Sequence, residues 1–262
     1  MLTYPMINPI AFHIIFWPVY WYGLMYLVGF LVGWGLLSLR TRYSPRGFTQ
    51  DEVSDIAFYA ALGAIIGGRL GYILFYDWHV LFSNPLLIFQ VWKGGMSFHG
   101  GLLGVLIAMV VLTKKTQQSF LALTDFIAPV VPIGLGAGRI GNFINDELWG
   151  RVTDASWGMI FPNGGPLPRH PSQLYEFSME GVLLFLILII FSWKPRPLGA
   201  VSGLFALCYG VFRCIAEFFR EPDVQIGYLF WGMTEGQLLS LPLILVGVVL
   251  LVWSCKNRAI AV

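Results

Sequence analysis

The sequence predicts an all-α, polytopic membrane protein with seven transmembrane helices, and three observations support this fold class. Hydrophobic residues make up 57% of the 262 residues and charged residues only 11%, whereas soluble domains carry about 25% charged residues. The mean hydropathy is +0.72. Apolar runs near the roughly 20 residues that a spanning helix needs recur along the chain. Runs such as 180–193 show no alternation of polar and apolar residues, so a membrane β-barrel is not expected.

Glycine, proline and charged residues divide the apolar sequence into seven expected spans. They cover residues 19–39, 53–75, 95–113, 121–143, 173–193, 199–218 and 235–254. The first, third, fifth and seventh spans each end shortly before a basic residue, namely Arg40, Lys114, Lys194 and Lys256. The second span follows an acidic pair, the fourth follows a polar stretch, and the sixth follows a stretch that contains two prolines.

The seven spans are expected to form one membrane domain that covers residues 1–262. Residues 144–172, between the fourth and fifth spans, are rich in glycine, proline and tryptophan. This stretch is too polar to cross a bilayer. We therefore expect it to form a periplasmic head segment over the outer ends of the helices.

The basic residues of the loops predict the direction of the chain. One side of the membrane receives Arg40, Arg42, Arg46, Lys114, Lys115, Lys194, Arg196, Lys256 and Arg258. The other side receives Lys93, Arg151, Arg169 and Arg220. Because lysine and arginine accumulate in cytoplasmic loops, the N-terminus is expected to be periplasmic and the C-terminus cytoplasmic. An odd number of spans agrees with this orientation.

Three arginines fall inside the expected spans: Arg69, Arg139 and Arg213. A cation within the membrane costs several kcal/mol, so such residues usually face a bundle interior or an aqueous cavity and mark function. At about 1.5 Å per residue, all three lie roughly 21 to 27 Å from the cytoplasmic start of their helices. They therefore reach the outer half of a hydrocarbon core of about 30 Å. His99 and Tyr22 stand near the outer starts of their own spans and are expected at the same depth.

The residue types at this depth favour binding of a phospholipid phosphate. Arginine offers a planar fork of donors that matches phosphate, and it stays charged when desolvated. Tyr209, Arg213 and Glu217 recur at every fourth position and therefore share one face of a helix. Asn142 can donate to and accept from glycerol hydroxyls, and His99 is the proton acceptor of the set near neutral pH.

Each of these residues also has a structural interpretation. Arg213 and Glu217 can satisfy one another at a spacing of four residues. For Arg69 the structural role is the favoured one. His99 taken alone fits a tightly packed helix interface as well as it fits a base, because glycines surround it. The shared depth of these residues is the observation that favours a functional site.

Other classes of site have little support in the sequence. Cys208, Cys214 and Cys255 are odd in number and show no metal-ligand spacing, so neither a disulfide framework nor a metal centre is expected. The formal net charge is only +2, with the basic residues dispersed among the loops, so no nucleic-acid partner is expected.

Several motifs resemble those of one known family. The stretch GRIGNFINDELWGR at 138–151 resembles the signature of the bacterial phosphatidylglycerol:prolipoprotein diacylglyceryl transferases. The segments YWYGLMYLVGF, GGRLGY, GGMSFHGGLLG, RHPSQLYE and YGVFRCIAEFFREPD are similar to further motifs of that family and stand in the same order. The resemblance covers essentially all 262 residues.

The resemblance implies a seven-span enzyme of the bacterial cytoplasmic (inner) membrane, with a polar cavity open to lipid and to the periplasm. Such an enzyme transfers the diacylglyceryl group of phosphatidylglycerol to the lipobox cysteine of a prolipoprotein signal peptide and releases glycerol 1-phosphate. Its partners would be these two substrates and the surrounding membrane lipids, and no cofactor or metal is implied.

The resemblance also implies a set of site residues. The expected catalytic residues are His99, Arg139, Arg213 and Tyr22. The expected lipid-binding residues are Arg139, Asn142, Glu147, Gly150, Tyr209, Glu217 and Arg69. We expect His99 to accept the thiol proton, and we expect the arginines to neutralise charge on the leaving phosphate.

Two other classes of function compete with this interpretation. A transporter for an anionic solute would also carry buried arginines, but it requires access from both sides and often shows inverted repeats, which are not evident in the sequence. A non-catalytic membrane scaffold would explain the apolar composition. It gives no reason for several ionisable groups to share one depth.

Overall fold

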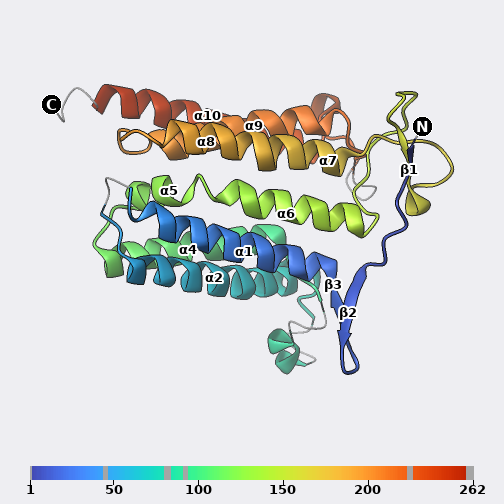
Figure 1. Ribbon diagram of the computed structural model, residues 1–262, viewed down its shortest axis with the longest axis horizontal. Coiled ribbons are helices and arrows are strands. Elements are labelled where there is room, and N and C mark those ends of the chain that lie inside the picture. Colours follow the sequence, from blue (N-terminus) through green and yellow to red (C-terminus); the bar gives the residue numbers. More distant parts are fainter. Residues whose placement is uncertain (1, 44–46, 80–83, 91–93, 223–226, 258–262) are drawn as a thin grey trace. The chain divides into compact units, whose positions relative to one another are not determined.

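The computed structural model describes residues 2–43, 47–79, 84–90, 94–222 and 227–257 (Figure 1). Six of the described helices are long and apolar enough to cross a membrane, and a bent pair of shorter helices would make a seventh. The predicted multi-span helical class is confirmed. Four short strands are also present, so the described chain is mostly helical and not purely α. The direction of the chain stays a prediction, and Arg46, Lys93 and Arg258 lie outside the described residues.

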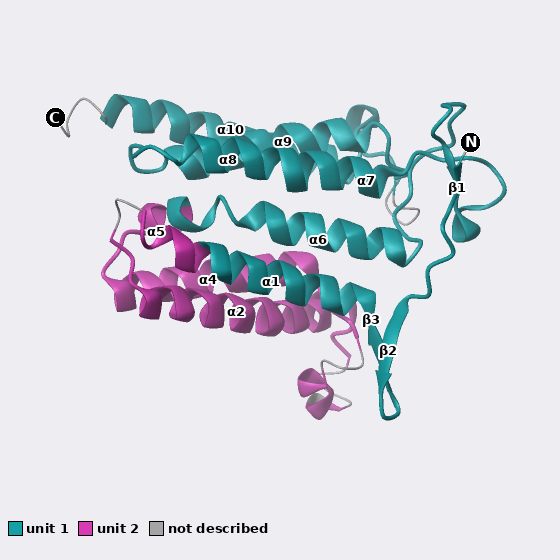
Figure 2. Cartoon of the chain, viewed as in Figure 1, with its two compact units in different colours: residues 1–36, 125–262 teal, residues 37–124 magenta. Residues whose placement is uncertain are grey.

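The chain divides into two compact units (Figure 2). Unit 1 comprises residues 1–36 and 125–262, and unit 2 comprises residues 37–124. The helices of unit 2 are α2 (Gln50–Tyr76), the 3-10 turn η1 (Pro85–Phe89) and α4 (Phe98–Thr116). The longer helices of unit 1 are α6 (Val131–Ile144), α7 (Ser172–Glu176), η4 (Phe177–Leu183), α8 (Leu184–Phe191), α9 (Ala200–Glu217) and α10 (Glu235–Asn257). Two short 3-10 helices, η3 (Pro162–Gly164) and η5 (Phe230–Gly232), also belong to it. Helices α1 (Trp21–Arg40) and α5 (Phe120–Ile127) each include residues of both units.

In unit 2, helices α2 and α4 pack through glycines. A Cβ atom added to Gly67 would lie 2.3 Å from the carbonyl oxygen of Gly100, and one added to Gly104 would lie 2.0 Å from that of Gly63. Small residues allow two membrane helices to approach until their backbones touch. These glycines therefore set the distance between α2 and α4.

The fourth predicted span is broken into α5 and α6. Residues 128–130 between them form a turn, and Pro132 stands in the first turn of α6. Proline lacks a backbone N–H and is favoured in the first turn of a helix, where no donor is needed, so Pro132 suits the start of a new helix. The hydropathy of the sequence predicts one uninterrupted span at 121–143 and gives no sign of this break.

Near this break, the buried side chain of Asp125 is bound to the start of α9. Its Oδ2 accepts a hydrogen bond from the Gly199 backbone N–H at 2.8 Å, and its Oδ1 accepts from the Ser202 N–H at 2.8 Å. The first N–H groups of a helix have no partner within the helix and favour negative charge. The carboxylate of Asp125 therefore caps α9 from another span.

The fifth predicted span contains a wider helical turn. Helix α7 continues into η4, a π-helical stretch, and then into α8. Gly181 in η4 lies against Gly136 of α6, where an added Cβ would lie 2.9 Å from the Gly136 Cα. Single π-helical turns are rare and occur often at functional sites. This turn carries Glu180, a buried acidic residue.

Residues 145–171 contain no α-helix and include the short strand β4 (Met159–Ile160). Strand β1 (Leu2–Thr3) pairs in parallel with β4. The next residue, Tyr4, is buried, and its hydroxyl donates to the carbonyls of Phe143 at 2.8 Å and Ile144 at 2.9 Å. The N-terminus is therefore fastened to the end of α6 and to the segment that follows. The assignment of residues 144–172 as a periplasmic head stays a prediction.

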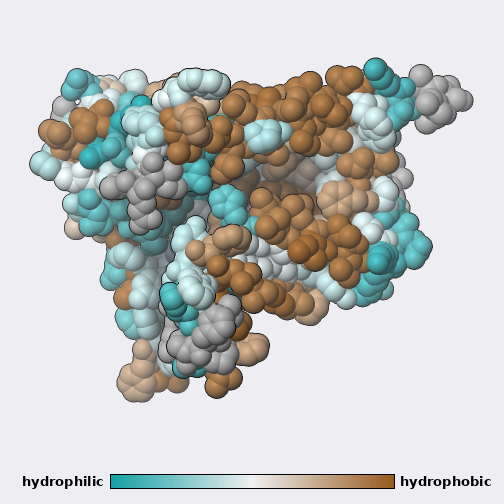
Figure 3. Space-filling model, turned by 180° about the vertical axis from the view of Figure 1, so that it is seen from behind, coloured by the Kyte–Doolittle hydropathy of each residue, from teal (hydrophilic) through white to brown (hydrophobic). Residues whose placement is uncertain are grey.

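Strands β2 (Ile10–Ile14) and β3 (Trp17–Tyr20) form an antiparallel hairpin that leads directly into α1. Along the long helices many large apolar side chains face outward, among them Leu245, Val249 and Val252 of α10. Figure 3 shows large areas of hydrophobic residues on the face of the protein that it displays. An apolar outer surface is what contact with lipid requires.

We expect Gly67→Ala to destabilise the protein by about 1 to 3 kcal/mol, because the added methyl group overpacks the contact between α2 and α4. Thermal unfolding of the detergent-solubilised protein measures this change. Gly35→Ala is the matched control, because this α1 glycine is exposed and nothing lies within 4 Å of its added Cβ. An unfolding midpoint of Gly67→Ala at or above that of Gly35→Ala would contradict the expected contact.

Candidate functional site

A buried cluster of charged side chains lies within the predicted spans of unit 1. We call it the charge cluster, and its members are Arg139, Glu176, Glu180, Arg213 and Glu217. Helix α6 supplies the first arginine, the α7–η4 span supplies the first two glutamates, and α9 supplies the remaining pair. The cluster therefore joins three spans.

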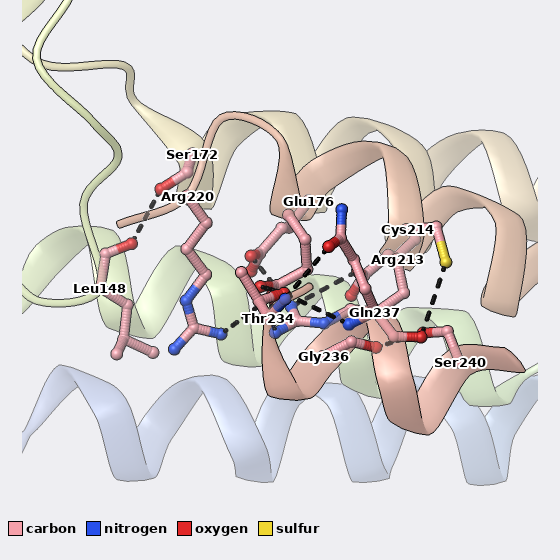
Figure 4. Close-up of polar contacts among 12 residues, drawn as sticks. Leu148, Ser172, Glu176, Arg213, Cys214, Arg220, Thr234, Gly236, Gln237 and Ser240 are labelled. Carbon is pink, nitrogen blue, oxygen red and sulfur yellow. Dashed lines mark hydrogen bonds and ion pairs between the residues drawn. The ribbon is translucent and has the colours of Figure 1, made fainter. Parts of the chain in front are cut away.

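Glu176 is the centre of the charge cluster because it binds both arginines. Its Oε2 lies 2.7 Å from Arg139 Nε, and its Oε1 lies 3.0 Å from Arg213 Nη1. Figure 4 shows Glu176 and Arg213 pointing toward one another. A carboxylate that bridges two guanidinium groups holds both of them in a fixed orientation.

Glu180 approaches the same two arginines at longer distances. Its Oε2 lies 3.4 Å from Arg139 Nη2, and its Oε1 lies 3.7 Å from Arg213 Nη1. Oε1 makes no hydrogen bond within the described part of the chain. Glu180 is therefore a counter-ion of both arginines but is bound less closely than Glu176.

Glu217 closes the cluster toward the end of α9. It forms an ion pair with Arg213 at the i, i+4 spacing that the sequence predicted. Its Oε2 accepts a hydrogen bond from Thr234 Oγ1 at 2.6 Å, and Arg220 Nη1 lies 3.6 Å from its Oε1. A Cβ on Gly236 would lie 2.6 Å from this carboxylate. Only glycine therefore leaves room for the carboxylate at that position.

The arginines are more accessible than the glutamates that neutralise them. The exposed fraction of the side chain is 17% for Arg139 and 12% for Arg213, against 1% for Glu176, 0% for Glu180 and 4% for Glu217. With Arg220, three positive charges meet three negative charges. Guanidinium groups on the accessible side of such a cluster can meet an external anion while the carboxylates hold them from behind.

Glu176 and Glu180 are not among the residues predicted from the sequence. Both lie in the expected span 173–193, four residues apart, and are thus ionisable groups within a membrane helix. The criterion that selected the three buried arginines would have selected these acids as well. Their depth within a span was the available signal.

Tyr209 of α9 lies one helical turn before Arg213. It interacts electrostatically with Glu180 and with both arginines of the charge cluster, and its ring stacks on Phe205 at 5.8 Å between centroids. The structure therefore brings Tyr209 to the charge cluster together with Arg139, Arg213 and Glu217.

A second polar patch lies at the end of α6, within two turns of Arg139. Asn142 Nδ2 donates to Glu147 Oε1 at 2.8 Å, and Asn145 Nδ2 donates to the same oxygen at 3.3 Å. The ring of Tyr22 lies over Gly141, where an added Cβ would come within 2.7 Å of it. The patch thus unites Tyr22, Asn142 and Glu147, three of the sequence-predicted residues.

Gly150 lies where three chain segments cross. A Cβ atom there would lie 2.4 Å from the Phe219 carbonyl oxygen and 2.7 Å from His170 Cβ. The Gly150 N–H donates to the His170 carbonyl, and the Arg151 N–H donates to that of Phe219, both at 2.8 Å. Arg151 Nη2 also donates to the carbonyl of Glu217 at 3.2 Å. These bonds fasten residues 150–170 to the end of α9, next to the charge cluster.

Burial shifts two ionisable groups in the segment after α6. Burial raises the pKa of Asp146, although its hydrogen bond from the Asn163 N–H, at 2.7 Å, favours the ionised form. Burial lowers the pKa of His170, whose Nδ1 lies 3.1 Å from Tyr175 Oη. Both shifts follow from the loss of solvation of the charged form.

Arg69 and His99 belong to unit 2. The guanidinium group of Arg69 is buried and donates to the backbone carbonyls of Gly94 at 2.6 Å, Gly95 at 3.1 Å, Ile88 at 3.2 Å and Leu87. These bonds fit the structural interpretation of Arg69. His99 is exposed in the first turn of α4, edge-on to Phe98. Contact of either residue with lipid or with the charge cluster stays a prediction.

No group of three or more His, Cys, Asp or Glu side chains in the described ranges is arranged to hold a metal ion. The carboxylates of the charge cluster are instead paired with guanidinium groups. The chemistry that this arrangement offers is therefore recognition of an anion by arginines at the depth of a membrane helix.

The sequence is similar to one family of known proteins. The family model described as prolipoprotein diacylglyceryl transferase matches residues 9–253. The chain is 58% identical over 260 residues to a phosphatidylglycerol--prolipoprotein diacylglyceryl transferase from Pseudomonas paraeruginosa (strain DSM 24068 / PA7), covering 99% of this chain and 98% of the relative. It is also 58% identical over 259 residues to the protein of that name from Coxiella burnetii (strain RSA 331 / Henzerling II), covering 98% and 99%.

Proposed function

The chain belongs to the prolipoprotein diacylglyceryl transferase family, and we propose that it transfers the diacylglyceryl group of phosphatidylglycerol to a prolipoprotein. The acceptor is the thiol of the lipobox cysteine in the signal peptide, and the second product is glycerol 1-phosphate. This reaction is the first step of bacterial lipoprotein maturation. The observation that carries the proposal is the pair of accessible arginines, Arg139 and Arg213, within membrane spans.

The proposed location is the bacterial cytoplasmic membrane, with the N-terminus periplasmic and the C-terminus cytoplasmic. The excess of basic residues in alternate loops supports this orientation. In this orientation the charge cluster lies in the outer half of the membrane and faces the periplasmic leaflet. Phosphatidylglycerol would enter laterally from that leaflet, and residues 144–172 would lie above it as the head segment.

The reaction forms a carbon–sulfur bond at the glyceryl carbon that carries the phosphate. The sulfur attacks this carbon, the carbon–oxygen bond to the phosphate breaks, and the phosphate leaves as glycerol 1-phosphate. The thiol proton passes to a base. An unperturbed thiol has a pKa of about 8.5, so removal of the proton near neutral pH needs either a base or a positive field.

Arg139 and Arg213 bind the phosphate of the donor lipid and neutralise the charge that gathers on it as the bond breaks. A positive group aimed at developing charge in a water-poor site makes a large contribution to catalysis. Glu176 holds both guanidinium groups from behind, so they need not reorganise when the lipid arrives. Tyr209 and Glu217 support Arg213 on the same face of α9.

The patch at the end of α6 is proposed to hold the glycerol head group. Asn142 and Glu147 supply a donor and an acceptor for its hydroxyls, and Tyr22 adds a phenolic hydroxyl beside them. Gly150 contributes by allowing the segment after α6 to cross close to α9. Arg69 is proposed as a further lipid-binding residue. His99 is proposed as the base that accepts the thiol proton.

The purified protein should add a diacylglyceryl group to a lipobox peptide when it is incubated with phosphatidylglycerol, and mass spectrometry of the peptide measures the addition. The matched peptide with serine in place of cysteine should remain unmodified, because the nucleophile is the sulfur. Unmodified cysteine peptide, with transport of an anionic solute into sealed vesicles, would support a transporter instead.

Arg139→Lys should lower kcat/KM by about tenfold or more, because an ammonium group lacks the fork that matches both Glu176 and phosphate. The rate of peptide modification measures this change. The control is Arg42→Lys, since Arg42 is exposed in the stretch after α1. Activity of the Arg139 variant equal to that of the control would refute bidentate phosphate recognition by this residue.

His99→Gln should lower turnover by about a hundredfold at neutral pH, because general acid–base catalysis contributes about 10² to 10⁴ in rate. Single-turnover rates with saturating lipid isolate the chemical step. His13→Gln, in the exposed hairpin, is the control. Normal turnover of the His99 variant would mean that the arginine field alone activates the thiol.

A further inference from the structure

Glu180 is the one carboxylate of the charge cluster to which the proposed reaction assigns no role. It has no exposed surface and lies on the π-helical turn η4. Within the described residues its Oε1 makes no hydrogen bond, as is also true of Oε2 of Glu176. Glu176, one turn earlier, already holds both arginines at 2.7 Å and 3.0 Å. Glu180 lies farther from the two arginines, at 3.4 Å and 3.7 Å. Its carboxylate therefore adds negative charge next to them without binding either one closely.

The charges of donor and product explain what this extra negative charge can do. The phosphate of phosphatidylglycerol is a diester and carries one negative charge. Glycerol 1-phosphate is a monoester whose second pKa is about 6, so it carries close to two negative charges at neutral pH. An arginine pair without buried counter-ions would therefore bind the product more tightly than the donor, and release would be slow.

We propose, building on the proposed function, that Glu180 is a positioning residue that acts as a buried counter-anion to Arg139 and Arg213 and promotes release of the phosphate monoester. Its carboxylate lies behind the arginines and repels the second negative charge of the product. Glu176 meanwhile keeps the guanidinium groups oriented. Glu176 thus orients the two arginines, and Glu180 limits their affinity for anions.

The first test uses the wild-type protein. Its affinities for glycerol 1-phosphate and for the diester glycerophosphoglycerol are measured as inhibition constants in the lipobox-peptide assay. We expect the monoester to bind no more than about threefold more tightly than the diester, despite its extra charge. A preference for the monoester of tenfold or more would overturn the proposal, and this result does not depend on any variant being folded.

The second test is Glu180→Gln, which keeps the shape of the side chain and removes its charge. The inhibition constant of glycerol 1-phosphate should fall by about tenfold, which corresponds to about 1.4 kcal/mol. KM for phosphatidylglycerol should fall by a smaller factor, and kcat should fall because product release slows. A purely structural role would weaken binding of lipid and product together, which is the opposite direction.

Two further variants serve as controls. Glu180→Asp retains the charge and should keep an inhibition constant close to that of the wild type. Glu221→Gln removes a carboxylate that is 41% exposed and paired with Arg169, outside the charge cluster. This variant should leave the inhibition constant of glycerol 1-phosphate and KM for phosphatidylglycerol unchanged. The thermal unfolding midpoint of each variant reports whether it is folded.

An unchanged or increased inhibition constant in folded Glu180→Gln would overturn the inference. That outcome is separate from failure of the proposed function, which would appear as a wild-type protein that leaves the cysteine peptide unmodified. If the wild type modifies the peptide and the variant shows no change in product inhibition, the transferase assignment stands and the role of Glu180 does not.

Discussion

The structure of unit 1 depends on the neutralisation of arginine charges within membrane helices. Arg139 and Arg213 cannot be buried alone, because an unpaired cation in an apolar medium costs several kcal/mol. Three glutamates from the α7–η4 span and from α9 surround them. This requirement couples α6, α7, η4 and α9, so the position of each guanidinium group is set by residues on other helices.

Close approach of backbones makes these ion pairs possible. Gly136 of α6 lies against Gly181 of η4, and Gly203 and Gly210 of α9 lie against α10. A side chain at Gly136 or Gly181 would separate α6 from η4 and lengthen the ion pairs between them, and one at Gly203 or Gly210 would separate α9 from α10. Gly150 likewise lets two backbones come close together, because the segment after α6 crosses the end of α9 there, beside Glu217. Glycine is thus a requirement of the charged site as well as of helix packing.

The proposed chemistry uses a cluster whose formal charges, together with Arg220, balance before the lipid arrives. Arginines held by carboxylates are oriented before the phosphate arrives. Their N–H groups can then donate to the phosphate and to the carboxylates at once, without a change of conformation. The same carboxylates limit how tightly any anion can bind. A site that must accept a phosphate diester and then release a phosphate monoester needs both properties. The balance between guanidinium and carboxylate charge is therefore a part of the proposed catalytic design.

The sequence alone determined the membrane class, the positions of the spans and the buried arginines, because hydrophobic run length and the cost of intramembrane charge are local properties of the chain. The pairing of Arg213 with Glu217 was also predictable from their spacing. The bridging role of Glu176, the break before Pro132 and the crossing at Gly150 came only from tertiary structure. These features depend on which helices are neighbours, and a single span carries no information about the partner that will face it.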